Sequence, residues 1–140
     1  MVRGADRGDL NRLYRAAIEA AIGRIEKDGH FQPLVFELRG NGTVQNVAVL
    51  DMAATDGRLS VLERLADLLR PRIRDGIARA VAVVRHTRDG RRIDVRLRAR
   101  DYSADIAVPY SAASTGVLRR RRHVRLGPAQ ERAVPNDLFR

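Results

Sequence analysis

The strongest constraint on the fold is a set of three stretches between Ala80 and Tyr110 in which apolar residues recur at every second position. Turns at Asp89-Gly90 and Asp101-Tyr102 would align these stretches as antiparallel strands. The facing sets are Ala80, Ala82, Val84 and His86, then Ala99, Leu97, Val95 and Ile93, then Ala104, Ile106, Val108 and Tyr110. A shift of one residue at the second turn would set Ala99 against Asp105, so we reject it. The pattern predicts a three-stranded meander with one apolar face.

A long amphipathic helix is predicted near the start of the chain, from Asp9 to Asp28. Its apolar residues follow the spacing of a single helical face. They are Leu10, Leu13, Tyr14, Ala17, Ile18, Ala21, Ile22 and Ile25. Gly29 follows directly, as is typical just past a helix end.

Two short strands are predicted around Asn41-Gly42, which favours a two-residue hairpin turn. In that register the facing pairs are Leu38 with Gln45, Phe36 with Val47, and Leu34 with Val49. Leu34, Phe36, Val47 and Val49 would then share one face of the hairpin.

A second helix is predicted to open at Ser60, because Ser60-Val61-Leu62-Glu63 fits a capping box. Its apolar side would carry Leu62, Leu65, Ala66 and Leu69. We expect Pro71 to end or kink this helix, because proline has no backbone N–H to donate.

The order of elements, α-β-β-α-β-β-β, predicts an α+β fold. We expect an antiparallel sheet of five strands, or six if the C-terminal segment adds one, with the two helices mainly on one face. A length of 140 residues corresponds to one domain. We assign it to residues 1–116 and expect the basic segment 117–140 to dock on it.

The chain is strongly basic, with a formal net charge of +10. Of its 27 basic residues only Lys27 is a lysine. Half of the excess charge lies in segment 117–140, which contains the run "VLRRRRHVRL". Arginine clusters suit phosphates and carboxylates, because the guanidinium group donates two parallel hydrogen bonds. This run is therefore the first candidate for a binding surface.

The polar face of the meander is the second candidate. Here Arg85 lies opposite Asp94 and Arg98 opposite Asp105, so part of the positive charge is neutralised within the sheet. The candidate binding residues on the two surfaces are Arg119, Arg120, Arg121, Arg122, Arg125, Arg96, Arg98 and Arg100.

Several kinds of chemistry lack support in the sequence. There is no cysteine, and His30, His86 and His123 lie too far apart for a metal-binding motif, so we expect neither metal nor cofactor. His86 is expected to be a core-edge histidine bonded to the backbone. No apolar stretch is long enough to span a bilayer and no secretory signal is apparent, so we expect a cytoplasmic protein without a membrane partner.

Four segments resemble a family of small uncharacterised bacterial proteins. They are "GHFQPLVFELRGNGTVQNVAV", "IARAVAVVRHTR", "RDYSADIAVPY" and the closing "PNDLF". The resemblance covers most of the chain and implies a shared fold, but it implies no particular activity. It also implies that the ending is part of the fold, with Leu138-Phe139 docked on the body. The element order is similar to that of roadblock and profilin-like domains, which are mostly interaction modules.

We therefore expect a non-enzymatic protein-interaction or regulatory module. Two alternatives stay open: non-specific nucleic-acid binding through Arg119 to Arg125, and an enzyme that uses the carboxylates of Asp51 and Asp56. A protein partner is favoured over nucleic acid, because no aromatic residues for base stacking are interleaved with the arginines. A homodimer would be consistent with an exposed edge strand.

Overall fold

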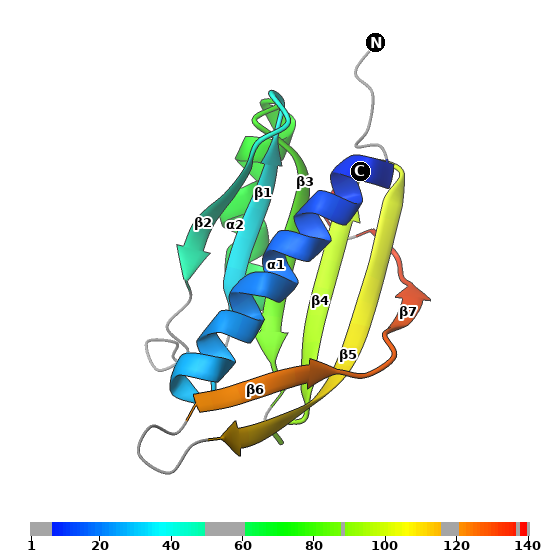
Figure 1. Cartoon of the computed structure of the whole chain (residues 1–140). Coiled ribbons are helices and arrows are strands. Elements are labelled where there is room, and N and C mark those ends of the chain that lie inside the picture. Colours follow the sequence, from blue (N-terminus) through cyan, green and yellow to red (C-terminus); the bar gives the residue numbers. More distant parts are fainter. Residues whose placement is uncertain (1–6, 50–60, 88, 116–120, 137, 140) are drawn as a thin grey trace.

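The computed structural model describes residues 7–49, 61–87, 89–115, 121–136, 138 and 139. These residues form two helices and seven strands (Figure 1). The elements are α1 (Arg7–Asp28), β1 (Leu34–Arg39), β2 (Val44–Val49), α2 (Val61–Arg74), β3 (Ala78–His86), β4 (Arg92–Ala99), β5 (Tyr102–Thr115), β6 (Arg121–Leu126) and β7 (Gln130–Ala133). The α+β fold and the order of the first seven elements are as predicted, and the C-terminal segment adds two strands instead of one at most.

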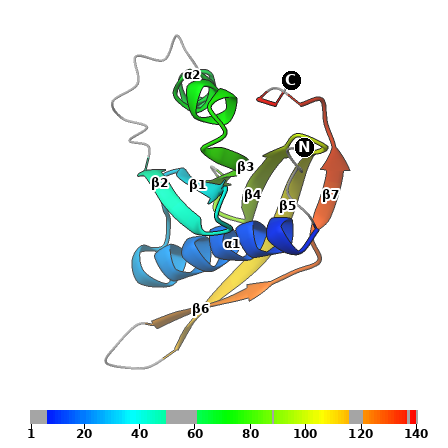
Figure 2. The same ribbon diagram turned by 90° about the horizontal axis from the view of Figure 1, so that it is seen from above.

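All strands belong to one antiparallel arrangement, in the order β2-β1-β3-β4-β5-β6, with β7 also paired to β5. The long strand β5 has two successive partners on the side away from β4. Its residues Ala104–Ala107 pair with β7, and Tyr110–Thr115 pair with β6. As a result β5 and β6 form a two-stranded ribbon that extends beyond the rest of the sheet (Figures 1 and 2).

Helix α1 crosses one face of the sheet and closes the larger core there (Figure 1). Its buried residues are Leu13, Ala17, Ile18, Ala21 and Ile25, all from the predicted apolar face. They pack against alternate residues of β1, β3 and β4, among them Phe36, Ala82 and Val95. The apolar face predicted for the meander is therefore the face that α1 covers.

Helix α2 lies on the opposite face of the sheet, which corrects the expectation that both helices share one face (Figure 2). Its Leu69 packs in a second, smaller core with Val35, Val81 and Val83. These strand residues alternate with those that face α1, so β1 and β3 are buried on both faces. The run Ala80–Val84, which is apolar at every position, is typical of strands covered on both sides.

A buried ion pair also holds α2 to the sheet. Glu37 of β1 is fully buried and accepts two hydrogen bonds from Arg72 of α2, from Nε at 2.6 Å and from Nη2 at 2.8 Å. Nε of Arg39 lies 3.7 Å from the same carboxylate. The bidentate geometry makes this contact one of the stronger kinds of polar interaction.

Pro71 does not end α2, which stops instead at the segment Arg74 to Gly76. The helix continues through this proline to Arg74 and ends where Gly76 takes a positive φ of 75°. Ile77 N–H donates to the carbonyl of Arg72, and Gly76 N–H to that of Ile73, which is a Schellman ending. Pro71 lacks the N–H of a regular helical hydrogen bond, and because it stands in the last turn of α2, any distortion that it causes affects only the end of the helix.

The register of the first hairpin is correct only at one end. Leu34 pairs with Val49 as predicted, but Phe36 pairs with Asn46 and Leu38 with Val44. The register shifts between Val35 and Phe36, because the loop holds three residues instead of two and β2 carries a bulge. Val47 consequently packs on the α2 side of the sheet, away from Phe36.

In the meander, the β3–β4 register is as predicted, with Ala80 opposite Ala99 and His86 opposite Ile93. The β4–β5 register is offset by two residues, so that Ala99 lies opposite Tyr102 instead of Ala104. The turn is made by Arg100-Asp101. An offset of two leaves every side chain on its predicted face.

The end of the chain packs on the α2 face. Leu138 and Phe139 contact the smaller core, where residues of β1, β3 and α2 meet. Asn136 donates from Nδ2 to the carbonyl of Ala99 at 2.6 Å, and its Oδ1 accepts from the N–H groups of Leu138 and Phe139. These contacts connect β7, at the rim of the sheet, to the core under α2.

Candidate anion-binding face of the sheet

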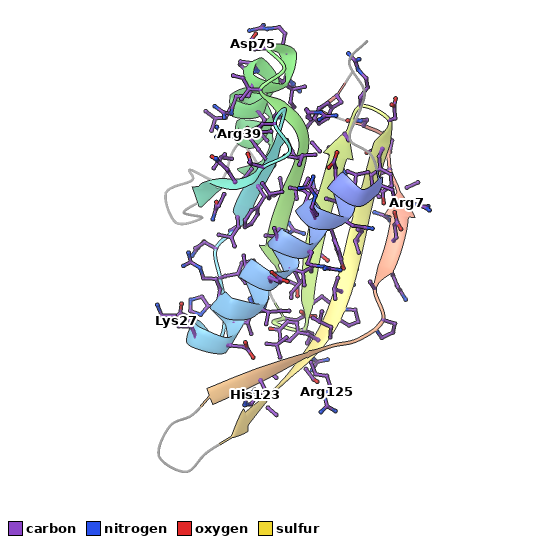
Figure 3. All side chains as sticks on the ribbon, turned by 45° about the horizontal axis from the view of Figure 1, so that its top comes forward. Arg7, Lys27, Arg39, Asp75, His123 and Arg125 are labelled. Carbon is purple, nitrogen blue, oxygen red and sulfur yellow. The ribbon has the colours of Figure 1, made fainter. Side chains whose placement is uncertain are left out.

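The arginine run of the C-terminal segment lies only partly within the described residues. Arg119 and Arg120 lie outside them, and so do the loop carboxylates Asp51 and Asp56. Arg121 and Arg122 begin strand β6, so this part of the run belongs to one strand of the ribbon. Arg125 is exposed on this ribbon and lies opposite Ser111 (Figure 3).

The ribbon is held to the body through Val124 of β6. Val124 packs against the α1-side core, and its N–H donates to Oε2 of Glu26 at 3.2 Å. Since β6 has β5 as its neighbour on one side only, the Glu26 carboxylate occupies part of its outer edge.

Arg98 supports the sheet and is not available to a ligand. Only 4% of its surface is exposed, and its Nη1 donates to the carbonyls of Leu97 and Ala104, both at 3.0 Å. The same Nη1 lies 2.9 Å from Oδ1 of Asp105, although Oδ1 receives no hydrogen bond because the N–H groups are directed at the carbonyls. The predicted Arg98–Asp105 pair therefore exists as an ion pair, on a diagonal of the sheet instead of directly across it.

A hollow of about 490 Å³ opens on the α2 face of the sheet, between β4, β5 and β7. Four arginines line it, Arg85, Arg92, Arg96 and Arg132, together with the carboxylates of Asp94 and Asp105. Arg96 belongs to the predicted binding residues. Arg100, which was predicted with it, is exposed in the β4–β5 turn and does not line the hollow.

The strand registers explain how these residues meet. One row across the sheet runs from Arg96 to Asp105 and on to Arg132, and the next row runs from Asp94 to Ala107 and Gln130. Directly opposite residues point to the same face, so both rows face the hollow. Ala107 has the smallest side chain in these rows, and the longer side chains around it form the walls.

The charges lining the hollow do not cancel. Arg85 forms an ion pair with Asp94 at 3.5 Å, and Asp105 is neutralised by the buried Arg98. Arg92, Arg96 and Arg132 form no ion pair with any residue that the structure describes. Three guanidinium groups are thus directed at one concave, solvent-accessible surface, which favours carboxylate or phosphate ligands.

The sequence could not reveal Arg132 as a member of this site. Strand β7 is four residues long and exposed at every position. It therefore lacks the alternation of apolar and polar residues that would predict a strand. Arg92 lies on the polar face of the meander, and its position on β4 follows from the register of the first meander turn.

His86 lies at the edge of the core, as predicted, but its partner is a side chain and not the backbone. Its Nε2 lies 2.6 Å from the hydroxyl of Tyr110, and its ring stacks on Phe31 with centroids 5.2 Å apart. Burial lowers the pKa of His86, with a smaller contribution from His30. Burial also raises the pKa of Tyr110. This cluster closes the ribbon end of the core.

The chain has no match among protein-family models, curated proteins or solved structures. Among the residues described, no three His, Asp or Glu side chains are grouped so that they could hold a metal ion. No helix in this part of the chain combines the length and apolar character needed to cross a membrane.

Proposed function

We propose that this chain is a non-enzymatic interaction module that binds an acidic segment of a partner protein in the arginine-lined hollow. The observation that carries the proposal is the set of three guanidinium groups, of Arg92, Arg96 and Arg132, that line the hollow without an ion-pair partner among the described residues. Carboxylates are the natural ligands for such a set, because each can accept two hydrogen bonds from one guanidinium group.

A protein ligand suits the hollow better than nucleic acid does. The described residues that line it include no aromatic side chain on which a base could stack. The walls also carry Asp94 and Asp105, whose carboxylates disfavour a continuous phosphate backbone.

Non-specific nucleic-acid binding is the second candidate, and the ribbon favours it. Strand β6 starts within the arginine run, and Arg125 and His123 are exposed on it (Figure 3). A two-stranded ribbon is a shape that the major groove of DNA admits. This mode would use the ribbon and leave the hollow unoccupied.

The test compares two double variants of equal net charge. Arg96→Gln/Arg132→Gln removes two charges from the hollow, and Arg15→Gln/Arg24→Gln removes two from exposed positions of α1. Binding is measured with a labelled peptide in which Glu alternates with Thr, and separately with a duplex oligonucleotide. We expect the hollow variant to bind the peptide at least about tenfold more weakly, since each charged hydrogen bond contributes about 1.5 kcal/mol or more.

The control variant should stay within about twofold of the wild type, because its charges are distant and screened. Equal peptide affinity of the two variants would overturn the proposal. Binding of the oligonucleotide alone, with an affinity that falls steeply with salt, would establish the second candidate instead.

A further inference from the structure

The three outer edges of the sheet differ in how well they are protected against pairing. The edge strand β2 carries a bulge, and the edge of β6 is met by the Glu26 carboxylate. Bulges and inward-pointing charges are common means of preventing the addition of another strand. Strand β7 is short and carries Glu131 and Arg132, but its pairing with β5 has no bulge, it is exposed at every position, and in the described part of the chain it pairs only with β5. Figures 1 and 2 both place it at the outer rim of the sheet.

The backbone of β7 directs hydrogen-bonding groups outward. Val134 N–H donates to the carbonyl of Ser103, which continues the pairing of Asp105 with Arg132. Inward and outward amides alternate along an antiparallel strand, so Glu131 and Ala133 direct their N–H and C=O groups away from β5. Their amides are the ones that an added strand would pair with.

The side chains next to this edge select what can be added. The row Arg96, Asp105, Arg132 alternates in charge and ends in a cation at the rim. A fourth member of the row, on an added strand, would lie beside Arg132 at the usual cross-strand distance of about 5 Å. A carboxylate there would extend the alternation, whereas a cation would be repelled.

Glu131 also borders the hollow, but its side chain does not compete for this position. Alternation places its side chain on the α1 face. Burial is the larger cause of the raised pKa of Tyr14 on that face, and the negative charge of Glu131 raises it further. The hollow face of β7 therefore carries Gln130 and Arg132, without an acidic side chain of its own.

We infer that the acidic ligand binds as an extended strand added to the outer edge of β7, with alternate carboxylates directed into the hollow. This inference rests on the proposed function and specifies the conformation and register of the ligand. Main-chain hydrogen bonds to Glu131 and Ala133 hold the ligand strand, and the arginines select its acidic side chains.

The first test removes an outward donor of β7 while leaving the charges unchanged. Ala133→Pro deletes one outward N–H at an edge position, where proline is tolerated, and Ala133→Ser is the matched control. We expect Ala133→Pro to bind the alternating Glu/Thr peptide about tenfold more weakly, and Ala133→Ser to bind like the wild type. Amide exchange at Val134 reports whether β7 remains paired with β5 in each variant.

The second test leaves the protein unchanged, so it does not depend on how the proline variant folds. Two versions of the peptide are N-methylated at alternate amides, one at the odd positions and one at the even positions. An added strand uses only one of these sets, so one version should lose affinity by about tenfold or more and the other should not.

The outcomes separate the two proposals. If Arg96→Gln/Arg132→Gln weakens binding, while Ala133→Pro and both methylated peptides bind normally, then strand addition is wrong and the acidic-ligand function stands. If the arginine variant also binds normally, both proposals are wrong.

Discussion

At the scale of single residues, the pair Glu37–Arg72 is asymmetric in a way that mutations can reveal. Glu37 is fully buried, whereas the Arg72 side chain is 36% exposed. Removing the arginine leaves a carboxylate that cannot reach water, but removing the carboxylate leaves an arginine that can. The hydrogen bonds that Arg72 donates to the Glu37 carboxylate, together with the negative charge of that group, also raise the pKa of Arg72, so the arginine stays charged.

We therefore predict that Arg72→Ala lowers the free energy of unfolding by about 3 kcal/mol and Glu37→Gln by about 1 kcal/mol. Urea denaturation at neutral pH measures both values. Arg70→Ala serves as the control, since Arg70 lies in the same helix in an exposed pair with Asp67. Equal losses for Arg72→Ala and Arg70→Ala would contradict the role assigned to Glu37.

His86 makes stability depend on pH. Its pKa in the folded chain lies below the ordinary value of 6.5, because burial disfavours the charged ring. The unfolded chain therefore binds the proton more readily, so stability is full above pH 6.5 and declines as the pH falls below it.

We predict that His86→Gln reduces this decline, whereas the exposed His123→Gln leaves it unchanged. Denaturation curves between about pH 5 and pH 8 measure it. An undiminished decline in His86→Gln would assign the effect to another group.

At the scale of elements, the ending of α2 and the middle of α1 offer a matched pair of glycines. A Cβ at Gly76 or Gly23 would meet no atom within 4 Å, but only Gly76 has a positive φ, at 75°. The two alanine substitutions should therefore differ in their effect because of backbone conformation and not because of steric contacts.

We predict that Gly76→Ala destabilises the protein by about 1 kcal/mol, whereas Gly23→Ala stabilises it by about 0.5 to 1 kcal/mol. Thermal melting of the two variants measures both signs. Destabilisation by Gly23→Ala would mean that the α1 surface has a contact outside the described residues.

The strand registers show what sequence patterns can predict about the pairing of strands. Alternation fixes which face a residue takes, so all faces of the meander were predictable, and the turn predicted at Asp89-Gly90 supplied the β3–β4 register. Alternation cannot distinguish offsets of two residues, which is why the pairing of Ala99 was wrong. The bulge in β2 was not predictable from Asn41-Gly42, because the three-residue loop and the two-residue loop share those residues.

We predict that the hydrogen bonds of Asn136 hold β7, the strand proposed to bind the ligand, in place. Asn136 accepts from two amides and donates to Ala99, so Asn136→Ala loses three hydrogen bonds in a partly buried setting. We expect about 1 to 2 kcal/mol of lost stability and faster amide exchange in β7. Asn41→Ala, in an exposed hairpin loop, is the comparison. Unchanged exchange in β7 would show that β5 pairing alone retains this strand.

At the scale of the whole molecule, the fold class and element order were readable from the sequence, but the placement of α2 was not read correctly. The signal was present, because β1 and β3 are apolar on both faces and such strands need cover on both. The candidate site was predictable only where it lies on the meander. Arg96 was found there, whereas Arg132 depends on a strand with no pattern of its own.

The net charge of +10 predicts a stability that rises with salt. Like charges repel one another in the compact state, and salt screens that repulsion over about 10 Å or less. We expect the melting temperature to increase by a few degrees between about 20 mM and about 300 mM NaCl. The Arg15→Gln/Arg24→Gln variant, which carries two fewer charges, should gain less. A melting temperature that falls with salt would indicate that the ion pairs outweigh the repulsion.

The hollow is lined by arginine alone among the basic residues, and this limits how its binding could be controlled. A guanidinium group keeps its proton throughout the physiological pH range, and arginine does not undergo the acetylation by which cells neutralise lysine. The receptor charge at Arg92, Arg96 and Arg132 is consequently constant. Regulation of the proposed complex through charge would therefore act on the ligand, for example by phosphorylation of a Ser or Thr between its acidic residues, which would add negative charge to the bound strand.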